Sequence, residues 1–188
     1  MNTTLYSHIQ FMNPYLEARY LKLEESRNRL LDELEGLDEE LLNRPAAEGK
    51  WSINQTIAHL IQSEQLTNSY LQRKMREESL ETAGLAHVVR SLILRVALNT
   101  NMKFKAPAAV AQVPAQAALP SLRNQWDAAR YQLEDNLTEL PQDMLDKCIF
   151  RHPYAGMLTM PQTLTFLQDH FNHHARQIAR LRQQWLGN

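Results

Sequence analysis

Three of the seven histidines of the chain stand close together near its C-terminus, in the segment DHFNHHARQ, residues 169–177. Imidazole nitrogens bind divalent metal ions or transfer protons near neutral pH, so the spacing of these rings decides what the segment can do. In a helix, side chains four positions apart lie on one side, whereas adjacent side chains diverge by about 100°. His170 and His174 can therefore bind one ion together, and His173 cannot join them.

The sequence before these histidines predicts the helix that carries them. Thr159 and Gln162 have the spacing of a capping box, with a proline in the first turn, and the predicted helix runs to about Trp185. Apolar residues recur along it at steps of three and four, as on the buried side of a helix. That row contains two of the histidines: Leu164, Leu167, His170, Phe171, His174, Ile178, Leu181 and Trp185.

The same rule predicts a polar side for this helix, made of Asp169, His173, Gln177, Arg180 and Gln184. We therefore expect His173 to face solvent or the rim of the core. The two imidazoles in the apolar row need partners, because burying a polar ring without one is costly. Hydrogen bonds to neighbouring groups or a shared metal ion would both serve, and the His-x-x-x-His spacing favours the ion.

A third ligand would have to come from another helix. Ser52 and Gln55 form a second predicted capping box, which begins a helix that runs to about Glu78 and carries His59. His59 flanks the apolar row of that helix and is the first candidate. Rival histidines lie near predicted boundaries or loops, and spacing does not choose among them: His8, His87 and His152.

The remaining pattern predicts an all-α protein. One helix begins at Asn13-Pro14 and stops before Gly36, and two amphipathic stretches cover about 87–101 and 121–140. The connection 103–120 contains proline but no glycine, which indicates an extended or partly helical segment that could cover one end of a bundle. Neither strand alternation nor an internal repeat is found, so we expect an antiparallel four-helix bundle with additional short helices.

Length, charge and apolar content restrict the class of protein. A chain of 188 residues suits one core, so we expect a single domain over residues 1–188. The formal net charge is −1, with Lys and Arg spread along the chain, which argues against nucleic-acid binding. The N-terminus lacks the pattern of a secretion signal, and the apolar stretches are too short for a membrane span. We expect a cytoplasmic protein that binds neither nucleic acid nor membrane.

The single cysteine, Cys148, excludes an intramolecular disulfide and a cysteine-rich zinc site. A metal ion would therefore be held mainly by nitrogen and oxygen. Because no histidine stands near Cys148 in a recognisable arrangement, we expect it to be a small packing residue rather than a nucleophile.

Two segments together resemble the DinB-like (DinB/YfiT) superfamily of metal-binding four-helix bundles. They are WSINQTIAHL, residues 51–60, and HFNHHARQI, residues 170–178. A further segment, HPYAGMLT at residues 152–159, is similar to the lead-in of one branch of that superfamily. The resemblance covers nearly the whole chain. The chain departs from the commonest terminal run of the family at Ala175-Arg176-Gln177, where Arg-Gly-Gln is usual.

Carried over position by position, the resemblance implies a metal triad of His59, His170 and His174. The ion would be divalent, such as nickel, zinc or iron, with one or more positions left to water or substrate. Some relatives use a low-molecular-weight thiol as co-substrate in transferase or isomerase reactions, and homodimers are common among them. We therefore expect a metal-dependent transferase or hydrolase that acts on a small-molecule substrate, with a low-molecular-weight thiol as a further cofactor and a homodimer as its assembly.

Other residues are candidates for parts of this chemistry. Glu64 and Tyr70, which follow His59 in the sequence, are the first acid or base groups to test. Four basic residues could contribute to a pocket for the acidic groups of a thiol: Arg90, Arg95, Lys103 and Lys105.

Two other readings compete with a catalytic metal. One is a non-catalytic bundle that binds metal or a small ligand and acts in a stress response as a homodimer. Exposed apolar surface on the first or fourth predicted helix would favour it. The other is a structural protein whose histidines are satisfied by hydrogen bonds alone.

Overall fold

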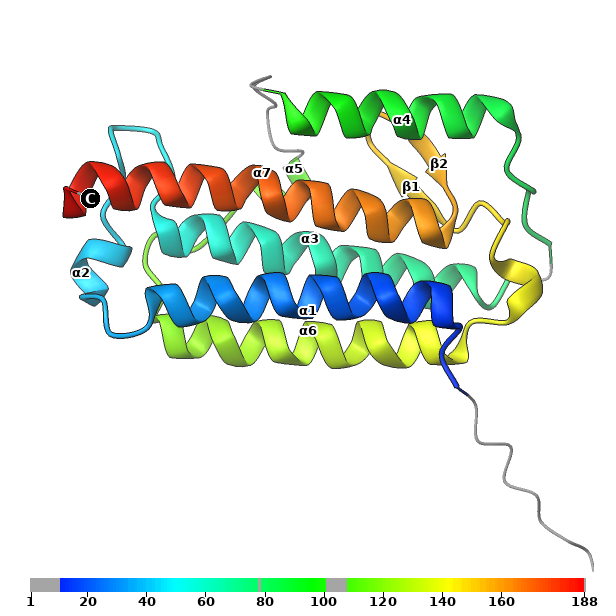
Figure 1. Ribbon diagram of the computed structural model, residues 1–188, viewed down its shortest axis with the longest axis horizontal. Coiled ribbons are helices and arrows are strands. Elements are labelled where there is room, and N and C mark those ends of the chain that lie inside the picture. Colours follow the sequence, from blue (N-terminus) through cyan, green and yellow to red (C-terminus); the bar gives the residue numbers. More distant parts are fainter. Residues whose placement is uncertain (1–10, 78, 101–107, 188) are drawn as a thin grey trace, which may run out of the picture.

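Four long helices form the core of the computed structural model, which describes residues 11–77, 79–100 and 108–187 (Figure 1). They are α1 (Pro14–Leu34), α3 (Ile53–Lys74), α6 (Leu119–Glu139) and α7 (Met160–Leu186). The connections contain shorter elements: α2 (Glu39–Leu42), α4 (Leu85–Asn99), α5 (Ala108–Ala111), the 3₁₀ helix η1 (Gln142–Met144), β1 (Phe150–His152) and β2 (Gly156–Leu158). The predicted all-α bundle is confirmed. His8, Lys103 and Lys105 lie outside the described residues.

Neighbouring helices of the bundle run in both senses. α1 is antiparallel to α6 and α3 is antiparallel to α7, whereas α3 runs parallel to α6 and α1 parallel to α7 (Figure 1). The parallel pairs arise because the connection after α3 returns along the bundle as α4, so that α6 begins at the same end as α3. The side-chain amide of Asn54, near the start of α3, accordingly donates to the carbonyl of Ala117, just before α6, at 2.7 Å.

Local signals in the sequence set where the long helices begin. The side chain of Asn13 accepts from the backbone N–H of Tyr15, and both predicted capping boxes are formed, at Ser52 and at Thr159. The helix ends agree less well with the prediction. α3 ends at Lys74 rather than near residue 78, and α4 covers 85–99 rather than 87–101. Few local signals mark these ends, and helix ends fray.

Apolar side chains from all four long helices fill the bundle. One cluster surrounds Trp126 and Phe171, and an adjoining cluster surrounds Leu23, Leu133 and Leu164. Each fully buried large apolar side chain stabilises the folded state by about 1.5–3 kcal/mol relative to its exposure. The apolar row predicted for α7 therefore supplies much of the contact that holds this helix against its neighbours.

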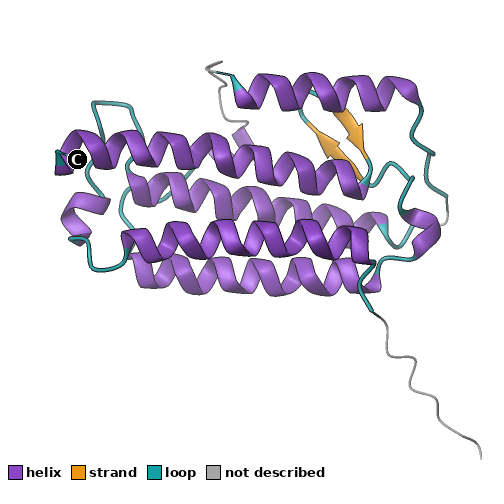
Figure 2. Ribbon diagram, viewed as in Figure 1, coloured by secondary structure: helices purple, strands orange, loops and turns teal. Residues whose placement is uncertain are grey.

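α4 lies outside the four-helix bundle, against α7 and a small hairpin (Figure 2). The hairpin pairs β1 with β2 in antiparallel fashion, Phe150 opposite Leu158. Strands of three residues are too short to show alternation, which is why the sequence did not predict them. Leu94 and Leu98 attach the inner side of α4 to this hairpin. Among the described residues, every helix falls short of the length or apolar character needed to cross a bilayer.

Candidate metal centre

His59 of α3 meets His170 and His174 of α7 where these antiparallel helices lie side by side. The Nε2 atom of His170 lies 3.2 Å from that of His59 and 3.1 Å from that of His174. Nitrogen ligands at tetrahedral zinc, with bonds of about 2.0–2.1 Å, stand roughly 3.3 Å apart. Two of the three spacings are therefore close to those around a divalent ion, and all three nitrogens lie within 4.8 Å of one another, with His59 and His174 buried and His170 partly buried.

A backbone carbonyl sets the position of the ring proton on His59. Its Nδ1 lies 2.8 Å from the carbonyl oxygen of Val110 in α5. Because a carbonyl oxygen only accepts, Nδ1 carries the proton and Nε2 presents its lone pair to the cluster. The sequence predicted an extended or partly helical connection around α5 but did not reveal this contact, since it depends on α5 lying against α3.

A chain of three hydrogen bonds likewise fixes the ring proton of His174 on Nδ1. Nδ1 of His174 donates to Oε1 of Gln177 at 2.8 Å. The Gln177 amide donates to Nε2 of His173 at 3.2 Å, and Nδ1 of His173 donates to the carbonyl of Leu98 at 3.2 Å. The Leu98 carbonyl accepts only, so each neutral ring in the chain has one consistent tautomer. Nε2 of His174 is thereby left with its lone pair toward His170.

Burial keeps the three rings uncharged. Desolvation, reinforced by the neighbouring His59, lowers the pKa of His174 to about 3. Desolvation also lowers the pKa of His59, and it holds the pKa of His170 well below its ordinary value. Neutral imidazole is the form that binds metal ions, so protons compete weakly for these nitrogens near pH 7.

His173 lies at the rim, half-buried, in keeping with the prediction for the polar side of α7. α4 nevertheless covers part of that side, whereas Arg180 and Gln184 are exposed. Asp169, predicted to be on the polar side, is buried there, where it accepts from Asn99 at 3.1 Å and pairs with Arg95 at 3.7 Å. Periodicity assigns residues to the sides of one helix, but it does not reveal which side another helix covers.

His152, one of the rivals for third ligand, lies near the cluster without joining it. Its Nδ1 accepts from the backbone N–H groups of Tyr154 and Ala155 at 3.2 and 3.1 Å. Its ring packs edge-on against Phe166, with centroids 4.5 Å apart, and Phe166 stacks on His170 at 5.4 Å. His152 therefore supports the position of His170 through an intervening aromatic ring.

The two acid or base candidates do not lie at the cluster. Both carboxylate oxygens of Glu64 are engaged by Arg130 in the bundle core, at 2.6 and 2.9 Å. Tyr70 is eleven positions after His59, about 16 Å further along the helix axis, and its ring packs against Phe150 with centroids 5.7 Å apart. Both residues share α3 with His59, as their nearness in sequence predicted, but neither side chain is directed at the three histidines.

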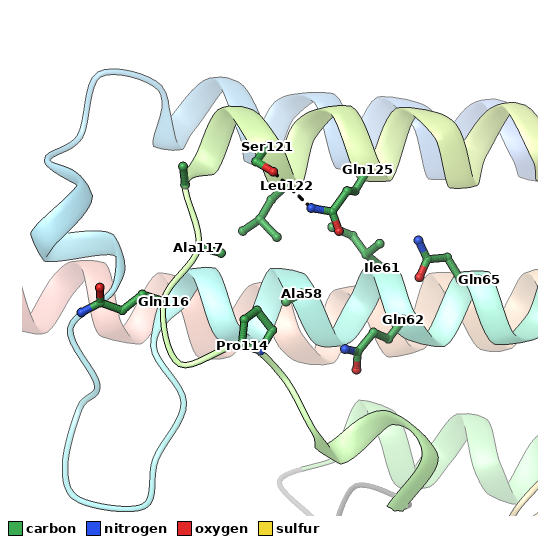
Figure 3. Close-up of a pocket in the computed structure, with 11 residues that line it drawn as sticks. Ala58, Ile61, Gln62, Gln65, Pro114, Gln116, Ala117, Ser121, Leu122 and Gln125 are labelled. Atoms are coloured by element: carbon green, nitrogen blue, oxygen red, sulfur yellow. Dashed lines mark hydrogen bonds between the residues drawn. The ribbon is translucent and has the colours of Figure 1, made fainter.

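A pocket of about 340 Å³ lies between α3, α6 and the connection that precedes α6 (Figure 3). Its lining is uncharged and includes four glutamines: Gln62, Gln65, Gln116 and Gln125. The three histidines are not among its lining residues. A smaller cleft between α4 and α7 is bordered by Arg95, Phe166 and Asp169, and Phe166 is the ring that stacks on His170.

The fold and the site together define a class: helical-bundle proteins in which two helices bring three neutral histidines to one point. The chain belongs to the DinB superfamily, whose sequence profile matches residues 22–178. It is similar to the uncharacterized protein YuaE of Bacillus subtilis (strain 168), with 23% identity over 160 residues, which cover 85% of this chain and 94% of YuaE. The resemblance found in the sequence is thereby confirmed.

Proposed function

We propose that the protein binds one divalent metal ion through His59, His170 and His174 and uses it in a transferase or hydrolase reaction of a small molecule. The observation that carries this proposal is that the three histidine rings converge with their ligand nitrogens close together. The rings of His59 and His174 each donate the Nδ1 proton to an oxygen atom, which leaves the lone pair of Nε2 for an ion. Three protein ligands leave room for water or substrate, as in catalytic sites. When bound, such an ion lowers the pKa of a coordinated water or thiol and so supplies a nucleophile near neutral pH.

The ligands limit which ion can bind, and the residues around them affect access of water and of a co-substrate. Nickel, zinc and iron all accept imidazole ligands, so the set does not choose among them. Trp51 packs on His59 with ring centroids 4.8 Å apart and, with Phe166, shields the rings from water. Of the basic residues suggested for a thiol pocket, Arg95 borders the cleft between α4 and α7. The cleft itself, at about 10 Å³, holds no more than a water-sized group, so an acidic group of a low-molecular-weight thiol would meet the exposed Arg95 side chain at its mouth.

Metal content tests this proposal directly. We expect elemental mass spectrometry of tag-free protein to show one equivalent of metal lost, relative to wild type, in each of His59→Ala, His170→Ala and His174→Ala. His173→Ala is the comparison variant: its ring binds no ion under this proposal, so at saturating metal it should keep one equivalent even though it belongs to the hydrogen-bond chain behind His174. Wild-type protein that stays free of metal after reconstitution with nickel, zinc or iron would leave the histidines as hydrogen-bonded core and rim residues.

One observation supports the homodimer that both metal-binding readings include. Aliphatic side chains are exposed along one side of α4, with Leu85 at 86%, Leu92 at 58% and Ile93 at 63%. Three valines complete the row: Val88, Val89 and Val96. We call these six residues the outer face of α4. This large exposed apolar surface lies on the third predicted helix, rather than on the first or fourth, because α4 carries apolar residues on both of its sides.

We infer that a second copy of the chain covers the outer face of α4. Arg90 and Arg95 flank this face, and both point back to the protein, Arg95 toward Asp169 and Arg90 toward Gly156. The face between them is uncharged, so two α4 helices related by a two-fold axis meet without opposing charges. Six such side chains present several hundred square ångströms, the same order as the roughly 800 Å² per partner of a standard interface.

A further inference from the structure

A second group of side chains of the types that bind metal ions lies at the N-terminal end of α4. Glu81 precedes this helix, His87 is in its first turn, and Cys148 comes just before β1. A carboxylate oxygen, an imidazole nitrogen and Sγ of these residues all lie within 4.8 Å of one another. We propose that Glu81, His87 and Cys148 bind a zinc ion, with water completing a tetrahedral shell. The proposal does not depend on the three-histidine centre.

Backbone pairing holds Glu81 opposite Cys148. The amide of Cys148 donates to the carbonyl of Glu81 at 2.8 Å, and the amide of Ala83 donates to the carbonyl of Asp146 at 2.9 Å. Between these bonds Thr82 and Lys147 form an antiparallel β-bridge. Two segments more than sixty residues apart in the sequence are thus held together at the cluster, so only side chains need to move when an ion binds.

The ligand types and their burial suit zinc. Thiolate and imidazole ligands favour zinc over calcium or magnesium, which prefer oxygen ligands. Cys148 is buried, His87 is partly buried and Glu81 is exposed, so an ion reaches the cluster past Glu81. Ligand atoms of tetrahedral zinc stand about 3.3–3.7 Å apart. Nε2 of His87 is 3.9 Å from Glu81, and the exposed Glu81 side chain can supply the remaining movement.

Binding would exchange protons without any redox change. Burial, together with the Glu81 carboxylate, raises the pKa of the Cys148 thiol, so the thiol is protonated when no ion is bound. Binding forms a zinc–sulfur bond and releases the thiol proton to solvent. Nδ1 of His87 accepts from the amide of Gly84 at 3.0 Å. Coordination through Nε2 moves the ring proton to Nδ1 and gives up this one hydrogen bond in exchange for a metal–nitrogen bond.

The ion would fasten the beginning of α4 to the body of the protein. The far end of α4 is already attached, since the Leu98 carbonyl accepts from His173 and from Arg176. A helix held at both ends keeps its Leu98 carbonyl in place beside α7. The proposed zinc therefore has a structural role, and its ligands come from two segments that the fold brings together.

Cobalt spectroscopy isolates this site, because Cys148 is the only cysteine of the chain. A thiolate-to-cobalt charge-transfer band in the near ultraviolet can then arise only at Cys148, and the three-histidine centre gives none. On titrating full-length protein with Co²⁺, we expect a band that saturates at one equivalent and disappears on addition of Zn²⁺. Cys148→Ser should abolish it, and Glu81→Gln and His87→Asn should weaken cobalt binding at least tenfold.

Controls separate this site from other ways of binding cobalt. His170→Ala and Glu48→Gln, an exposed acid elsewhere, should leave the band unchanged. Because Cys148→Ser alters a buried position, the exposed Glu81→Gln variant provides a second test: Zn²⁺ should protect the thiol from a disulfide reagent in wild type but not in this variant. No band in folded wild type, a band unaffected in both Glu81→Gln and His87→Asn, or a band that grows with protein concentration through bridging between chains would overturn the proposal.

Discussion

At the scale of single residues, the groups behind the three histidines set the form in which the rings face one another. Val110 and Gln177 each hold the Nδ1 proton of one ring, so that His59 and His174 both direct a lone pair at His170. Outer partners of this kind orient metal ligands and raise their basicity. The carbonyl of Val110 belongs to the backbone, so a substitution of Val110 would not remove it. Gln177 acts through its side chain and can be tested by substitution.

Replacing Gln177 with Leu removes the acceptor for the His174 Nδ1 proton. We expect the affinity for Zn²⁺ or Ni²⁺ to fall by roughly 10- to 100-fold, the usual effect of losing an outer partner. A competition titration against a chromophoric chelator measures it. Gln184→Leu, an exposed position on the same side of α7, should bind like wild type. If Gln177→Leu also binds like wild type, the hydrogen-bond chain from Leu98 has no part in metal binding.

His152 should make stability depend on pH. Burial lowers its pKa to about 4 from 6.5, so the folded state favours the neutral ring. Its contribution is full above pH 6.5 and is lost as pH falls from 6.5 to about 4, where the unfolded chain takes up the proton first. Between pH 7 and 4, wild type should therefore lose about 3 kcal/mol more stability than His152→Asn.

Urea unfolding at several pH values, with metal concentration held constant, measures this difference. Asn is chosen because its side-chain oxygen can replace Nδ1 as acceptor for the amides of Tyr154 and Ala155. Parallel pH profiles for the two proteins would show that His152 does not titrate in a way linked to folding.

At the scale of elements, α4 has two roles that depend on its two sides. Its inner side buries Leu94 and Leu98 against the hairpin, and its end presents the Leu98 carbonyl to His173. Its outer face is apolar and exposed. A helix with apolar residues on both sides is stable in water when a partner covers the second side.

Substituting Leu92 by Glu places a charge in the middle of the outer face of α4. If two copies pair through this face, the variant should be monomeric at concentrations where wild type is dimeric, since pairing would bury two like charges. Sedimentation equilibrium measures the mass of each. Leu21→Glu on α1 is the matched control, because Leu21 is 57% exposed and Leu92 is 58% exposed. A wild type that is monomeric throughout, or a Leu92→Glu dimer, contradicts the assignment.

At the scale of the whole molecule, a buried charge network joins three of the four long helices. Arg130 of α6 donates to Glu64 of α3 and, at 3.0 Å, to Glu24 of α1. Burial alone would lower the pKa of Arg130, but the Glu64 carboxylate raises it, so the guanidinium stays charged. Such a network specifies how helices meet more than it adds stability, because removing charges from water offsets much of their attraction.

Arg130→Leu should lower the free energy of unfolding by about 3–5 kcal/mol, because it leaves the Glu64 carboxylate buried without a partner. The double variant Arg130→Leu/Glu64→Leu should recover most of that loss, since both charges are then absent. Urea unfolding gives both values, and a single transition in wild type would agree with the predicted single domain over residues 1–188. A double variant no more stable than Arg130→Leu would mean that the cost lies in packing.

The sequence by itself determined the long helices, their caps and the separation of His170 and His174 from His173, because these depend on residues within a few turns of one another. Spacing left His87 and His152 as rivals, and the family resemblance implied His59; the tertiary structure shows that His59 meets this pair and that α5 supplies the Val110 carbonyl. It also placed α4 against Asp169 and His173 on the polar side of α7 and brought His87 to Cys148. These contacts join segments far apart in the chain, and no local period encodes where such segments meet.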